Sequence, residues 1–166
     1  KHYELYQLVE SWIAKNFTII LDESFRKFEK RKSMRNQINN YKNSYIIQSF
    51  TKFYSCGGIS IGAIFSHKNN IEMLKTAMLN LSSFDAEFLK ERLKDKRFGQ
   101  QSRKLHKRHK RELLSSLEES KLFSKIYKSD SNFVMVKSKK SKEIFEHLLR
   151  HKILVRTCVS FYFLTN

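Results

Sequence analysis

Proline is absent from this 166-residue sequence, and cysteine occurs only twice. The two cysteines, Cys56 and Cys158, lie far apart and form no paired motif, which argues against a disulfide framework. Free thiols in a reducing, cytoplasmic setting are the simpler interpretation. We find no physical account for the absence of proline.

Long apolar runs are also missing from the chain. Because a helix needs about 20 apolar residues to cross a bilayer, we expect no membrane span and no membrane partner. The first residues are amphipathic and show no signal peptide. Hydrophobic residues make up 40% of the chain and aromatic residues 13%, a composition that predicts a globular fold.

Acidic residues are scarce relative to basic ones, with 16 Asp and Glu against 33 Lys and Arg, for a net charge of +17. This balance favours anionic partners but says little about the fold. The basic run at residues 103–111 could contact nucleic-acid phosphates. No zinc-finger, RNP or helix-turn-helix pattern accompanies it, and a solvated helix face is the simpler explanation of the run. We therefore do not expect nucleic acid as a partner, and keep a noncatalytic basic module as an alternative.

Helical and strand-like segments alternate along the first half of the chain, which is typical of an α/β sheet. The apolar run 17–21 is typical of a strand buried on both faces of a parallel sheet. Further strands are expected at 44–48, 59–65, 123–127, 132–137 and 153–159. Helices are expected at 3–15, 68–79 and 85–120, the last with an interruption near Gly99. Another helix is expected to begin after Ser141, which can cap it. The pattern predicts an α/β portion over residues 1–84 and a small α+β domain over residues 85–166.

An acid and a lysine stand out against this background. Asp22 follows the first predicted strand, and Lys52 follows the second. Ser49 and Thr51 precede the lysine, and glycines 57–58 come after it. A lysine can form a Schiff base with an aldehyde cofactor, and an acid can keep the ring nitrogen of that cofactor protonated. These residue types in this order suit pyridoxal phosphate (PLP) chemistry.

The segments 20–25, 49–54 and 58–62 together resemble the fold-type I PLP enzymes of the class I/II aminotransferase family. Within that family the sequence is most similar to histidinol-phosphate aminotransferases and threonine-phosphate decarboxylases. Downstream, 132–136 and 153–158 resemble two strands of the family's small domain. The resemblance follows the family order along nearly the whole chain, and it implies part of a large domain with a mostly parallel sheet, followed by a small α+β domain.

The resemblance also implies roles for single residues. Asp22 would pair with the pyridinium nitrogen of PLP, and Lys52 would form the Schiff base and then transfer a proton. Ser49 and Thr51 would donate hydrogen bonds to the cofactor phosphate. The glycines at 57–58 would allow a close backbone approach.

Two positions depart from the family pattern. Ser60 stands where the family has a phosphate-binding arginine, and the loss of that charged contact should weaken cofactor binding by about 1–3 kcal/mol unless another cation compensates. Phe25 replaces a tyrosine that contacts the cofactor ring. Phe25 and the segment 155–158 favour the decarboxylase branch. Arg156 is a candidate ligand for a substrate phosphate or carboxylate, and a surface ion-pair partner is the equal alternative.

The family's glycine-rich phosphate cup would lie upstream of Lys1, and its carboxylate-binding arginine beyond Asn166, so we expect the chain to be the C-terminal half of a family member. The resemblance implies an aminotransferase acting on an amino acid or amino-phosphate substrate, and a homodimer in the full-length form. The alternatives are a PLP-dependent decarboxylase of a phosphorylated amino acid and a degenerate module without turnover.

Histidine pairs provide the remaining candidate chemistry. The pairs His106/His109 and His147/His151 have helical spacing that suits a metal, but neither has a third ligand in its vicinity, so we expect no metal site. Cys56 lies near Lys52 without a neighbouring histidine, and we do not expect it to act as a nucleophile.

Overall fold

The computed structural model describes residues 3–28, 33–77 and 80–159 of the chain. It divides into two compact units: residues 1–108 with 130–132, and residues 109–129 with 133–166. Within the described ranges, no helix combines the length and the apolar character that crossing a bilayer requires.

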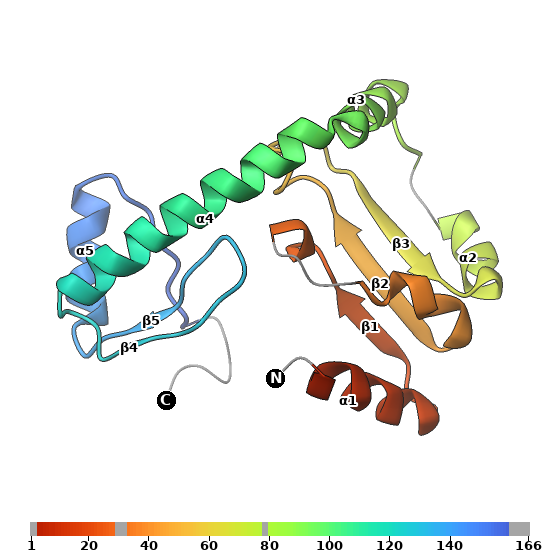
Figure 1. The fold of residues 1–166 in the computed structure, drawn as a ribbon, viewed down its shortest axis with the longest axis horizontal. Helices are drawn as coiled ribbons and strands as arrows, with labels where there is room; N and C mark the ends of the chain where they lie inside the picture. Colours follow the sequence, from red (N-terminus) through yellow and green to blue (C-terminus); the bar gives the residue numbers. More distant parts are fainter. Residues whose placement is uncertain (1–2, 29–32, 78–79, 160–166) are drawn as a thin grey trace. The chain divides into compact units, whose positions relative to one another are not determined.

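A three-stranded sheet forms the centre of the first unit. Its strands are β1 (Ile19–Asp22), β2 (Ser44–Ser49) and β3 (Gly62–Ser66), with β2 in the middle (Figure 1). β1 runs parallel to β2, and β3 runs antiparallel to it. The predicted α/β character is confirmed, whereas these three strands form a mixed sheet and not a mostly parallel one.

One face of this sheet is covered by α1 (Tyr3–Ala14) and by the 3-10 helix η2 (Met34–Asn40). Val9 and Ile46 are 1% and 0% exposed, and they form a core cluster together with Met34 and Ile38. At 25 cal/mol per Å² or so, burial of such aliphatic side chains contributes about 1.5–3 kcal/mol each. The helix predicted over residues 3–15 is therefore confirmed, and its amphipathic pattern reflects this contact.

The opposite face of the sheet remains open to solvent. Ile20, Ile47 and Ile64 are 64%, 40% and 37% exposed. The prediction that the first strand is buried on both faces is wrong for this chain, because its residues alternate between half-buried and exposed. The described helices cover only the face that carries Ile46.

A second core cluster, which we call the aromatic cluster, lies in the same unit. It consists of Phe28, Phe50, Phe53, Tyr54, Cys56, Ile61 and Leu89. The ring centroids of Phe28 and Phe53, and of Phe53 and Tyr54, are each 5.2 Å apart in edge-to-face geometry. Such pairs add about 0.5–1.5 kcal/mol beyond area burial, so this cluster gives the chain after β2 a defined position.

The helices that follow the sheet are α2 (Lys68–Leu74), η3 (Lys75–Ala77), α3 (Ser83–Lys94) and α4 (Lys96–Glu119). Residues 78–79 of the helix predicted over 68–79 lie outside the described residues. The long helical stretch is interrupted at Asp95, not near Gly99 as the sequence predicted. Asp95 Oδ1 accepts a hydrogen bond from Phe98 N at 2.9 Å, so this aspartate caps the start of α4.

The second unit contains two short strands and a helix. β4 (Lys125–Ile126) pairs antiparallel with β5 (Val136–Lys137), and α5 (Ser141–Arg150) follows. Lys140, not Ser141, occupies the cap position of α5, and it makes no side-chain capping bond. The strand predicted over 153–159 is also absent, because Lys152 has a φ of 61° and Ile153 N donates to Leu148 O at 2.9 Å, which turns the chain back at the helix end.

Candidate active site

Asp22 is the last residue of β1 and lies opposite Ile47 in the parallel ladder. Its side chain is exposed, and Oδ1 accepts a hydrogen bond from Ser24 N at 2.8 Å. This local bond orients the carboxylate at the strand end. No described residue bonds to the second carboxylate oxygen, so that oxygen is available to a ligand.

Lys52 lies three residues beyond β2, on a short helical turn. Tyr54 N donates to Phe50 O at 3.1 Å, which closes the turn. Phe50 and Phe53 are 7% and 3% exposed and pack into the aromatic cluster, whereas Lys52 between them is exposed. The buried aromatic side chains therefore hold the backbone while the lysine amine remains accessible, without a partner among the described residues.

Hydroxyl groups gather on the approach to Lys52. Ser49 Oγ and Thr51 Oγ1 are 2.9 Å apart, and because only one hydroxyl can donate within the pair, the other keeps its proton for a ligand. Pairing with β3 continues past the strand ends, since Phe50 N donates to Ile61 O at 3.2 Å. Ser60 precedes this pair and is exposed, so it lies at the same edge of the sheet.

The ends of β1 and β2 are joined by two further bonds. Glu23 N donates to Ile47 O at 2.8 Å, and Ser49 N donates to Ser24 Oγ at 3.2 Å. Because the carboxyl ends of parallel strands meet at one sheet edge, these bonds bring the segment of Asp22 beside the segment of Lys52. Sequence reasoning did not identify Ser24, since a serine after two acids is an ordinary loop pattern.

Glu23 is not a solvated loop residue. Its carboxylate accepts from Ser33 Oγ at 2.6 Å and from Met34 N at 3.3 Å, and Arg26 Nε lies 3.4 Å from Oε2. The Glu23 and Arg26 side chains are only 13% and 16% exposed. Glu23, which directly follows Asp22, is thus hydrogen-bonded to the start of η2.

Lys27 connects the segment after β1 to the turn that carries Lys52. Its Nζ donates to Tyr54 OH at 2.7 Å, and it lies 4.7 Å from the Tyr54 ring centroid and 5.3 Å from that of Phe50. Cation–π contacts of this kind stabilise by about 0.5–2 kcal/mol. Lys27 is therefore engaged with the turn that positions Lys52, and no sequence motif indicated this.

Phe25 packs against the aromatic cluster, with its ring centroid 6.5 Å from that of Phe28. The close backbone approach that the resemblance implied for the glycines at 57–58 stays a prediction. Within the chain itself, a close approach occurs at another glycine. A Cβ at Gly57 or Gly58 would meet no atom within 4 Å, whereas one at Gly62 would lie 2.9 Å from Gln48 O. Gly62 is the position at which the fold itself requires glycine.

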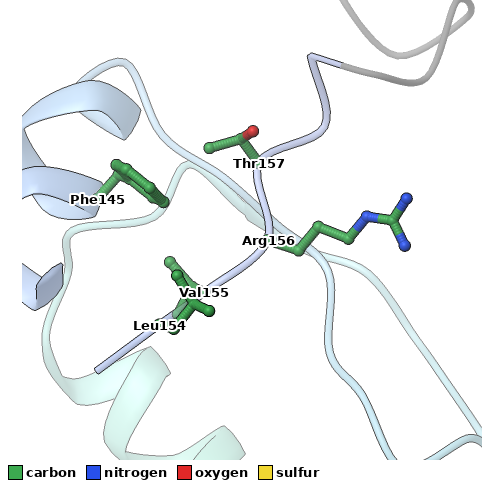
Figure 2. Close-up of a pocket in the computed structure, with 5 residues that line it drawn as sticks. All are labelled: Phe145, Leu154, Val155, Arg156 and Thr157. Carbon is green, nitrogen blue, oxygen red and sulfur yellow. The ribbon is translucent and has the colours of Figure 1, made fainter. Parts of the chain in front are cut away.

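Arg156 belongs to the second unit, where it lines an open pocket of about 480 Å³. The pocket is lined by Phe145, Leu154, Val155, Arg156 and Thr157. Figure 2 shows the guanidinium extending away from Phe145. The other lining side chains are apolar or a hydroxyl, so this pocket offers no acid–base pair.

The other candidate groups have structural roles. Cys56 is buried, with its Sγ 3.8 Å from Phe50 O. His106 packs edge-on against Phe28 at 5.2 Å, and the rings of His147 and His151 lie 4.4 Å apart. Across the part of the chain that the structure describes, no three His, Cys, Asp or Glu side chains could hold a metal ion together.

Comparison with known proteins identifies the family to which this chain belongs. The family model for aminotransferase class I and II matches residues 1–166. The chain therefore belongs to this family, whose members depend on PLP.

Individual relatives agree with this assignment. Histidinol-phosphate aminotransferase of Francisella philomiragia subsp. philomiragia is 25% identical over 92% of this chain and 43% of its own length. The structure of histidinol-phosphate aminotransferase from Clostridium acetobutylicum aligns with a TM-score of 0.89 at 24% identity, over 99% of this chain and 51% of that one. L-threonine-O-3-phosphate decarboxylase from Porphyromonas gingivalis aligns with a TM-score of 0.80 at 21% identity, over 98% and 51%.

These two structural likenesses show the fold. The chain spans less than half the length of the curated relative, and about half of each of the two solved chains.

The residues at this sheet edge fit PLP chemically. Asp22 has an acceptor oxygen to which no described residue bonds, Lys52 has an accessible amine, and the Ser49–Thr51 pair has a spare hydroxyl proton. Together they match a pyridinium nitrogen, an aldehyde and a phosphate. Ser60 supplies a neutral hydroxyl where the resemblance implied a cation.

Proposed function

We propose that this chain supplies the lysine-bearing part of a PLP-dependent aminotransferase that acts on an amino acid or amino-phosphate substrate. The observation that supports the proposal most directly is the joining of the Asp22 and Lys52 segments at one edge of the β1–β2 ladder. The family match and the named relatives support the same reaction class.

When bound, PLP withdraws electrons from the substrate α-carbon, and the residues of this chain hold and complement it. Asp22 would hold the pyridinium N–H through its second carboxylate oxygen. Lys52 would hold the aldehyde group through its amine, and the same amine would move a proton at the substrate α-carbon. Ser49 and Thr51 would hold the phosphate, with the spare hydroxyl proton of the pair as the donor.

The two proposed roles need different freedom of movement, and the surroundings of Lys52 and Asp22 agree with this difference. Lys52 needs freedom to bind and release, and it lies exposed on a turn whose neighbours Phe50 and Phe53 are buried. Asp22 needs a fixed orientation, and it receives one from the Ser24 amide. Catalytic groups on a rigid support with local mobility are a general feature of preorganised sites.

Substrate and assembly extend the proposal. Residues 1–84 would form the C-terminal part of the PLP-binding large domain and residues 85–166 the small α+β domain, with Arg156 as a substrate-binding residue and Phe25 beside the cofactor ring. We propose a homodimer for the full-length form. The free thiols Cys56 and Cys158 agree with a reducing, cytoplasmic location.

A decarboxylase of a phosphorylated amino acid is the second candidate. Phe25, which cannot donate a hydroxyl hydrogen bond, is the observation that favours it. The curated relative at 25% identity is named histidinol-phosphate aminotransferase, which favours transamination as the first candidate. Product analysis separates the two, because transamination conserves the substrate carboxylate and decarboxylation releases carbon dioxide.

Covalent trapping on the chain tests the proposal. After incubation with PLP and reduction with borohydride, peptide mapping should locate the phosphopyridoxyl group on Lys52. Lys52→Ala should abolish this labelling, whereas Lys68→Ala, which removes an exposed lysine from α2, should leave it unchanged. Equal labelling across the surface lysines would contradict the proposal. A salt-sensitive shift with nucleic acid, lost on neutralising residues 103–111, would favour the basic-module alternative.

A further inference from the structure

We infer that Ser24 is a positioning residue that couples the Asp22 segment to the Lys52 segment, so that the acid and the lysine are placed as one unit. This inference rests on the proposed function, because it assigns a purpose to the spacing of those two groups. The role of Ser24 is to position these two groups, and it includes no contact with cofactor or substrate.

Two hydrogen bonds of opposite direction meet at Ser24. Its backbone N–H donates to Asp22 Oδ1 at 2.8 Å. Its hydroxyl oxygen accepts from Ser49 N at 3.2 Å. One residue thus orients the carboxylate on β1 and fixes the end of β2, three residues before Lys52.

The position of Ser24 explains why a hydroxyl is needed. The β1–β2 ladder ends with Glu23 N donating to Ile47 O at 2.8 Å, and the next amide on β2 that requires a partner on this side is that of Ser49. Ser49 is half-buried, and a half-buried amide without a partner is unfavourable. The Ser24 side chain replaces the backbone carbonyl that a longer strand would have supplied.

The hydrogen bond between Ser49 N and Ser24 Oγ also affects the position of the Ser49 and Thr51 hydroxyls. Ser49 Oγ lies 2.9 Å from Thr51 Oγ1, so a shift of the Ser49 backbone moves the phosphate donors together with the lysine turn. Loss of the Ser24 hydroxyl should therefore disturb Lys52 and its donors together. The Asp22 carboxylate should keep its own bond, because that bond uses the Ser24 backbone.

The variants Ser24→Ala and Ser24→Thr test this coupling in the whole chain. Alanine keeps the N–H that Asp22 accepts and removes the oxygen that Ser49 N needs, while threonine restores a hydroxyl. Ser11→Ala is the matched control, because Ser11 Oγ donates to Leu8 O within α1 and, among the described residues, makes no bond to the sheet. Circular dichroism should show equal secondary structure for the three variants and the parent chain.

The first readout needs no cofactor. By NMR-detected hydrogen exchange, Ser24→Ala should speed exchange of the Ser49 amide by about threefold to tenfold, the range that one net hydrogen bond supports. Ser24→Thr and Ser11→Ala should leave it near the parent value. An unchanged Ser49 exchange rate in Ser24→Ala would overturn the inference.

The second readout is the rate at which PLP and borohydride label Lys52. Ser24→Ala should also lower the labelling rate by about threefold to tenfold, and Ser24→Thr should restore it. Faster Ser49 exchange with unaltered labelling would also overturn the inference, because the coupling would then have no effect on the lysine. If the parent chain is not labelled at Lys52, the proposed function fails, and the exchange measurement alone still decides whether Ser24 holds the two segments.

Discussion

Replacement of Glu23 by alanine should destabilise the first unit far more than an equivalent change on the surface. The Glu23 carboxylate accepts from Ser33 Oγ at 2.6 Å and Met34 N at 3.3 Å, and it faces Arg26 Nε at 3.4 Å. Arg26 Nε is buried and makes no hydrogen bond with any residue that the structure describes, and the Glu23 carboxylate beside it offsets its charge.

The magnitude follows from these contacts. A hydrogen bond to a charged acceptor contributes about 1.5–3 kcal/mol, and a cation left buried without its partner costs about 3–5 kcal/mol when it is fully desolvated. Arg26 keeps 16% exposure, and neighbouring effects are not additive, so we expect a loss of about 3 kcal/mol in the free energy of unfolding. Glu23→Gln, which keeps one acceptor, should lose about half of that.

Urea unfolding followed by far-ultraviolet circular dichroism measures the effect. The matched control is Glu72→Ala on α2, where the carboxylate lies 2.8 Å from Lys75 Nζ with 54% and 60% side-chain exposure. An exposed pair of this kind contributes about 0–0.5 kcal/mol. Equal losses for Glu23→Ala and Glu72→Ala would refute the reasoning, because the two changes remove the same group and differ only in burial and bonding.

Two further changes test the packing of the sheet. The hydrogen bond from Tyr41 OH to Glu10 Oε1 at 2.6 Å raises the pKa of Tyr41 above its usual value of 10.0, with burial and the Glu10 charge acting in the same direction. Tyr41→Phe should therefore cost about 0.5 kcal/mol at neutral pH. Because the pKa of Tyr41 is raised, the difference should begin to shrink near the usual value of 10.0 and vanish only when the pH exceeds the raised pKa, as measured by urea unfolding across this pH range. Gly62→Ala should cost about 1–3 kcal/mol in the same assay because its Cβ would lie 2.9 Å from the backbone oxygen of Gln48, whereas Gly58→Ala, in open space, should stay within about 0.5 kcal/mol.

Local pattern predicted the order of elements well. Periodic apolar residues identified α1, and the short apolar runs before Asp22 and around Ile46 identified β1 and β2. These signals are local, since a helix or strand buries residues at a spacing that its own geometry sets. The family assignment also rested on sequence, because the Asp22 and Lys52 motifs keep their order and separation along the chain.

Errors arose where a local turn or capping bond decides where an element begins or ends. The apolar segment 153–159 has strand-like composition, yet it pairs with no described strand and follows Lys152, which has a left-handed backbone conformation. The break in the long helix fell at Asp95, whose capping bond outweighs the flexibility expected of Gly99. Composition alone cannot report which hydrogen-bond partner is present.

The sequence by itself determined the class of the protein and the two residues proposed to do its chemistry, because residue types at a given separation define what chemistry is available. Tertiary structure decided how those residues are held. Ser24 and Glu23 are ordinary loop residues in sequence, and only the pairing of β1 with β2 and the packing of η2 bring Ser49 and Ser33 to them. The physical reason is that a hydrogen bond depends on a distance of about 3 Å between atoms that are here 10 and 25 residues apart in the chain, which no local pattern encodes.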